Sequence, residues 1–142
     1  MTPNATPGRA NILIVDDDAR VRRALCALIE CSPGLSVAGE ASTKSAAYQA
    51  DEALGPDVVI LDILLPTAQD GLEVLEDLAE TGRAVVALSL SEGLRAAAFA
   101  AGAGAFVEKY AGPDALLQAV RDVLARMCAH GHEHRLQNGS SP

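Results

Sequence analysis

The chain has 142 residues, 49% of them hydrophobic and 3% aromatic, which suits a single domain with an aliphatic core. Its formal net charge of −8 argues against direct binding of nucleic acid. No apolar stretch approaches the length of a membrane span, no secretory signal is recognisable, and three cysteines lack metal-like spacing. We therefore expect a cytoplasmic protein that does not associate with membranes.

Apolar runs alternate with helix-like patterns along the chain. The opening is polar and contains Pro3, Pro7 and Gly8, so residues 1–10 are expected to form a flexible N-terminal tail. Five apolar runs, each followed by a helical pattern, predict strands at residues 11–15, 35–39, 57–61, 84–88 and 104–108. This alternation predicts a parallel, doubly wound α/β sheet with right-handed crossovers.

Three segments outside the strands also have expected structures. Residues 66–71 are expected to form a loop, and the helix expected at residues 95–101 is mostly alanine, so it should bury little area and be loosely held. The last helix should begin at Pro113, a favourable first helical position. Polarity and glycine after this helix predict a domain at residues 11–128 and a C-terminal tail or truncated linker at residues 129–142.

Four charged residues follow the expected strands directly: Asp16, Asp17, Asp62 and Lys109. In an open parallel sheet the carboxyl ends of the strands meet at one edge, and ligands bind there. Three acids that converge at such an edge could not all stay ionised without a cation, and a nearby lysine suggests that an anion is also bound. The sequence therefore predicts a site for a divalent cation and an anion.

Segments 12–18, 57–63 and 70–75, with the strand that ends at Lys109, resemble the receiver domain of two-component response regulators. The resemblance implies a flavodoxin-like (βα)5 sheet with strand order 2-1-3-4-5. Segments 37–41 and 89–91 are similar to a subfamily whose members usually carry a C-terminal helix-turn-helix module. Such a module would lie beyond residue 142, so the chain is consistent with a whole protein or with the front of a DNA-binding regulator.

The resemblance also implies a mechanism. Asp62 would take a phosphoryl group from a phosphohistidine on a sensor histidine kinase. Asp17, Asp16 and Asp62 would hold Mg²⁺ together with the backbone carbonyl of Leu64, in keeping with the preference of this ion for a few oxygen ligands. Lys109 would neutralise phosphoryl oxygens. The domain would thus be a phosphoacceptor that assists its own phosphorylation and dephosphorylation, and not an enzyme with a separate substrate.

Two further residues would convert phosphorylation into a signal. Ser89 would bond a phosphoryl oxygen, although Ser91 is a competing candidate on the same side of the strand. Movement of Ser89 would free space for the ring of Phe106, which can act only by packing because it has no hydroxyl group. The surface formed by the fourth helix, fifth strand and fifth helix would then change shape for a partner or output domain. A homodimer on phosphorylation is also plausible from the family.

Three other functions remain open. The first is an interaction module that keeps the fold but works without phosphorylation. The second is a Mg²⁺-dependent phosphatase with an aspartyl nucleophile, because Asp16 and Asp18 form an Asp-x-Asp motif, but Ala19 and Arg20 replace the glycine-threonine turn expected after it. The third is a flavodoxin-like cofactor binder. It is disfavoured because segment 17–20 after the first strand is not a glycine- or hydroxyl-rich phosphate loop and would repel a phosphate.

Overall fold

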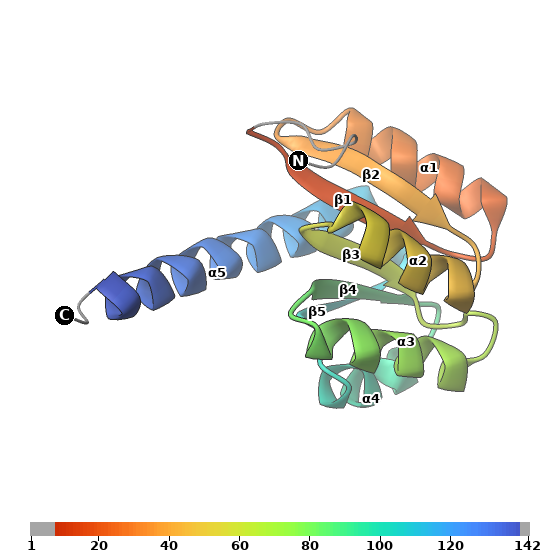
Figure 1. Cartoon of the computed structure of the whole chain (residues 1–142). Helices are drawn as coiled ribbons and strands as arrows, with labels where there is room; N and C mark the ends of the chain where they lie inside the picture. The colour runs from red at the N-terminus through yellow and green to blue at the C-terminus, as the bar shows by residue number, and fades with distance from the viewer. Residues whose placement is uncertain (1–7, 140–142) are drawn as a thin grey trace.

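The computed structural model describes residues 8–139. Its five strands form one parallel sheet in the order β2-β1-β3-β4-β5 (Figure 1). The strands are β1 (Ala10–Val15), β2 (Leu35–Ala41), β3 (Val58–Asp62), β4 (Ala84–Ser89) and β5 (Ala105–Glu108). The helices are α1 (Ala19–Glu30), α2 (Lys44–Leu54), α3 (Ala68–Glu80), α4 (Arg95–Ala100) and α5 (Pro113–Gly139). The predicted fold class and strand order are confirmed.

The core lies on both faces of the sheet, because neighbouring residues of a strand point to opposite sides. On one face, Ile12 of β1 and Ile60 of β3 pack with residues of α1 and α5. On the other face, Leu13 and Leu61 pack with residues of α2, α3 and α4. The central strands are therefore apolar on both sides, as expected for a parallel sheet that is covered by helices on both faces.

The turn between β3 and α3 differs from the prediction. The sequence predicted a loop over residues 66–71, whereas α3 begins at Ala68. Thr67 caps this helix, since its hydroxyl oxygen accepts a hydrogen bond from the backbone N–H of Asp70 and donates one to the Asp70 carboxylate. Gly71 lets the first turn of α3 pack against Ile63, the residue after β3, because a Cβ there would lie 1.6 Å from the carbonyl oxygen of Ile63.

The end of the chain also differs from the prediction. A C-terminal tail was expected at residues 129–142, but the backbone of α5 stays helical to Gly139 and extends beyond the sheet (Figure 1). Once the helix is docked, each further residue adds a hydrogen bond, so polarity and a single glycine need not end it. The predicted domain boundary at residue 128 stays a prediction. Most of the predicted N-terminal tail, residues 1–7, lies outside the described residues.

Helix α4 has little apolar surface to bury. It is six residues long, and Ala98 is its one buried residue. A methyl group contributes far less on burial than a leucine side chain does, so this helix gains little from packing on the sheet. Among the described residues, no helix is both long and apolar enough to cross a membrane.

Candidate phosphoacceptor and metal site

Three charged side chains meet at the carboxyl edge of the sheet. Asp16 directly follows β1, Asp62 is the last residue of β3, and Lys109 directly follows β5. The Lys109 Nζ lies 3.1 Å from Asp16 Oδ2 and 2.8 Å from Asp62 Oδ2. The lysine therefore bridges two carboxylates that are far apart in the sequence, as the predicted site requires.

The second oxygen of each carboxylate is bound by the backbone. Asp16 Oδ1 accepts a hydrogen bond of 2.9 Å from the N–H of Asp18, and Asp62 Oδ1 accepts one of 3.0 Å from the N–H of Leu64. Asp16 is fully buried and Asp62 is 3% exposed. Their orientation is thus held by the loops that follow the strands as well as by the lysine.

Burial and charge oppose each other at this site. Desolvation raises the pKa of Asp62, with a further contribution from the charge of Asp16, while the hydrogen bond from Lys109 acts in the opposite direction. Burial alone would lower the pKa of Lys109, but its bonds with Asp62 and Asp16 outweigh that effect and raise it. One ammonium group therefore faces two buried carboxylates and balances only part of their charge. The cluster retains an excess of negative charge.

Asp17 adds a third carboxylate. One oxygen each from Asp16, Asp17 and Asp62 can lie within 4.8 Å of one another, and Asp17 is exposed to solvent. Carboxylate oxygens on a partly open site suit Mg²⁺, which keeps several of its waters. The donor set thus fits the predicted ion. A role for the Leu64 carbonyl in binding it stays a prediction.

The structure separates the two candidate serines. Ser89 is 1% exposed at the end of β4, next to Leu88, which pairs with Asp62 in the sheet. Its hydroxyl oxygen accepts a hydrogen bond from the N–H of Ser91. Ser91 is exposed, and its hydroxyl oxygen accepts a hydrogen bond from the N–H of Gly93 at the start of a short 3-10 helix. Burial at the sheet edge favours Ser89, and its phosphoryl contact stays a prediction.

The predicted switch residue Phe106 lies on the α4 side of the sheet. It is 8% exposed and pairs with Ala87 of β4. The guanidinium carbon of Arg95 lies 5.3 Å from the centre of the Phe99 ring and 5.7 Å from that of Phe106. The sequence analysis missed Arg95. Its i,i+4 spacing to Phe99 was a usable signal, but the contact with Phe106 depends on how α4 packs against β5.

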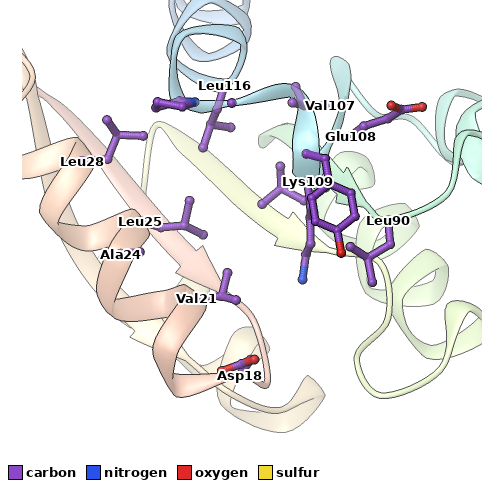
Figure 2. A pocket seen from close by; sticks show the side chains of 14 residues that line it. Asp18, Val21, Ala24, Leu25, Leu28, Leu90, Val107, Glu108, Lys109 and Leu116 are labelled. Carbon is purple, nitrogen blue, oxygen red and sulfur yellow. The ribbon is translucent and has the colours of Figure 1, made fainter.

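A groove of about 650 Å³, also not predicted, opens beside Lys109. Figure 2 shows side chains of α1, including Val21, Leu25 and Leu28, facing Lys109 and Leu116 across it. Asp18 and Glu108 add carboxylates to its lining. The groove therefore combines apolar walls with acidic groups, and it lies next to the charged cluster at the carboxyl edge of the sheet.

Known proteins show the same architecture. A LuxR-family two-component response regulator from Aurantimonas sp. SI85-9A1 is 31% identical with a TM-score of 0.77, and the match covers 82% of this chain and 86% of that one. The receiver domain of CheB from Thermotoga maritima is 27% identical with a TM-score of 0.67, covering 85% and 95% of the two chains. These similarities confirm the predicted receiver fold.

Similarity in sequence agrees with similarity in structure. The nitrate/nitrite response regulator protein NarL of Escherichia coli K12 is 35% identical over 120 residues, which are 82% of this chain and 55% of that protein. A protein-glutamate methylesterase/protein-glutamine glutaminase of Treponema denticola is 31% identical over 137 residues, 91% of this chain and 37% of that protein. The chain thus spans about half of the first protein's length and less of the second's. The family model for the response regulator receiver domain matches residues 12–121. The chain therefore belongs to the response regulator receiver domain family.

Proposed function

We propose that Asp62 accepts a phosphoryl group from a phosphohistidine on a sensor histidine kinase, in a Mg²⁺-dependent reaction. The observation that carries this proposal is the Asp62 carboxylate at the sheet edge, bound by Lys109 Nζ at 2.8 Å and by the N–H of Leu64 at 3.0 Å. Membership of the receiver family supports it, because phosphoryl transfer is the general function of that family. The reaction would take place in the cytoplasm, where the kinase obtains its phosphoryl group from ATP.

The transfer moves a single group between two side chains. A carboxylate oxygen of Asp62 forms a bond to phosphorus as the bond from phosphorus to the kinase histidine breaks, and the imidazole leaves with the electron pair of that bond. The donor set for Mg²⁺ is Asp16, Asp17 and Asp62, and the bound ion would supply positive charge for the phosphoryl oxygens. Lys109 provides a second positive charge that is already positioned.

In this reaction the domain is a phosphoacceptor and not an enzyme with a separate substrate. Asp62 is itself modified, and Lys109 acts within the same chain. A water molecule that attacks the acyl phosphate would regenerate the Asp62 carboxylate and release inorganic phosphate. The domain would thus assist both its own phosphorylation and its own dephosphorylation.

The signal would be a change in the surface formed by α4, β5 and α5. We propose that Ser89 bonds a phosphoryl oxygen and that Phe106 moves into the space that Ser89 leaves. These two residues lie on adjacent strands, since Phe106 pairs with Ala87, two positions before Ser89. A partner protein, an output domain or a second copy of this chain would bind the changed surface.

Incubation with acetyl phosphate, with and without Mg²⁺, tests the proposal. Intact mass should increase by one phosphoryl group only when Mg²⁺ is present, and not in Asp62→Asn. Beryllofluoride with Mg²⁺ should shift NMR signals around Asp62 in the wild-type protein. A protein that gains no adduct by either method would be an interaction module that works without phosphorylation. Phosphatase activity that survives Asp62→Asn but is lost in Asp16→Asn would indicate the Asp-x-Asp phosphatase instead.

A further inference from the structure

Arg95 is placed to connect α4 with β5. Its guanidinium carbon lies within 6 Å of two ring centres, at 5.3 Å from Phe99 on its own helix and at 5.7 Å from Phe106 on the strand. A cation at this distance from a ring is attracted by the negative charge on the ring face. One side chain therefore holds an aromatic ring from each of the two elements.

Two glutamates lie close to the same guanidinium. Arg95 Nε is 3.8 Å from Glu92 Oε1. Glu108 lines the same groove as Arg95 and Glu92. Interaction with Glu92 raises the pKa of Glu108, and the positive charge of Arg95 lowers it. Glu92 precedes α4 and Glu108 ends β5, so the charges around Arg95 link the same two elements as the rings do.

The strand residues that Arg95 faces lead back to the buried site. In the sheet, Phe106 pairs with Ala87, and Glu108 pairs with Ser89. Alternate residues of a strand share a face, so Phe106 and Glu108 lie on the same face of β5. A displacement at Ser89 would therefore act on the paired strand β5, where Phe106 and Glu108 lie next to Arg95.

We propose that Arg95 is a positioning residue that latches α4 onto β5 and resists the movement of Phe106. This inference rests on the proposed function, because it assumes that Phe106 moves on phosphorylation. Ala98 is the one buried residue of α4, so the helix has little other apolar contact to hold it. Loss of the latch releases α4 and shifts the domain toward its phosphorylated conformation without phosphorylation.

The first measurement concerns the latch itself. The chain contains two phenylalanines, so 4-fluorophenylalanine labelling yields two ¹⁹F signals, both from rings beside Arg95. Arg95→Gln should shift both signals. It should also speed hydrogen exchange at the amides of Ala101 and Gly102, which bond to α4 carbonyls, by about fivefold, the size expected for lost cation–π contacts. Arg95→Lys should restore part of the protection, and Arg23→Gln on the exposed side of α1 should change neither quantity. Unchanged exchange in Arg95→Gln would overturn the proposal.

The second measurement concerns coupling to the site. If Arg95 resists the switch, Arg95→Gln should bind beryllofluoride with Mg²⁺ up to about fivefold more tightly than wild type, because less of the binding energy is used to release α4. Arg23→Gln should bind like wild type. Unchanged affinity in Arg95→Gln, with binding intact in wild type, would overturn the latch alone. Failure of wild type to bind beryllofluoride would contradict the proposed function, and the inference about Arg95 would fall with it.

Discussion

Two clusters in this molecule each combine a pair of carboxylates with one basic side chain, and they differ in burial. Asp16, Asp62 and Lys109 form the first, in which the aspartates are 0% and 3% exposed. The second consists of Glu92, Glu108 and Arg95, where the side chains of Arg95 and Glu92 are 51% and 60% exposed. Glu108 and Lys109 are consecutive in the sequence, so the end of β5 supplies one residue to each cluster.

Burial decides what each cluster can do. In the buried cluster, water screens the charges little, so the ion pairs of Lys109 are strong and the remaining negative charge favours a cation. Such a cation, together with Lys109, would offset the charge of a phosphoryl group. In the exposed cluster, water screens the charges, so each contact is weak. Under the proposed function, the weak cluster lies in the part of the molecule that would move, and the strong one lies in the part that would react.

The largest expected effect is the loss of the phosphoryl adduct. Asp62→Asn should accept no phosphoryl group from acetyl phosphate, because an amide oxygen is a poor nucleophile and carries no charge to interact with Lys109 or Mg²⁺. Intact mass spectrometry measures the adduct. Glu108→Gln, the matched change in the exposed cluster, should keep full phosphorylation. A normal adduct in Asp62→Asn would show that another residue accepts the group.

The next effect compares the two basic residues by matched substitutions. Lys109→Gln should lower the free energy of unfolding by about 3 kcal/mol, since it leaves two buried carboxylates without their cation. Arg95→Gln should lower it by about 1 kcal/mol, because its contacts are exposed. Urea unfolding in EDTA measures both. An equal loss of unfolding free energy in Lys109→Gln and Arg95→Gln would contradict the inference that burial makes the contacts of Lys109 stronger.

Addition of Mg²⁺ should act on the buried cluster alone. At a hundredfold excess over its dissociation constant, an ion that binds only the folded state raises the free energy of unfolding by about 2.7 kcal/mol. Wild type and Arg95→Gln should both gain this stability. Asp17→Asn should gain much less, because one of the three grouped carboxylates is lost. Equal stabilisation of Asp17→Asn would exclude Asp17 from the metal site.

The smallest effect is a change in titration at the exposed cluster. Interaction with the Glu92 carboxylate raises the pKa of Glu108, whereas the charge of Arg95 lowers it. Arg95→Gln should therefore raise the pKa of Glu108 further, and Arg121→Gln on α5 should leave it unchanged. A carboxyl pKa that is raised by folding favours the folded state at low pH, and this contribution is lost as the pH rises through the raised value. Carbon-13 NMR of the Glu108 carboxyl measures the shift, and a lower pKa in Arg95→Gln would contradict the assignment.

Much of the fold could be predicted from local patterns. The run of apolar residues before Asp62 predicted a strand buried on both faces, and all five residues of β3 are buried. The end of α5 and the start of α3 were predicted wrongly. A helix end depends on docking and on capping contacts such as that between Thr67 and Asp70, and polarity alone is a weak guide to both.

The sequence by itself determined which residue types end the strands, and from these the four charged residues of the site could be named. Parallel strands bring their carboxyl ends to one edge, so Asp16, Asp62 and Lys109 had to lie near one another once the topology was known. Only the tertiary structure decided which atoms pair, that Ser89 is buried while Ser91 is exposed, and that Arg95 spans Phe99 and Phe106. Those contacts join segments distant in the chain, and their distances depend on how helices pack on the sheet, which local patterns do not encode.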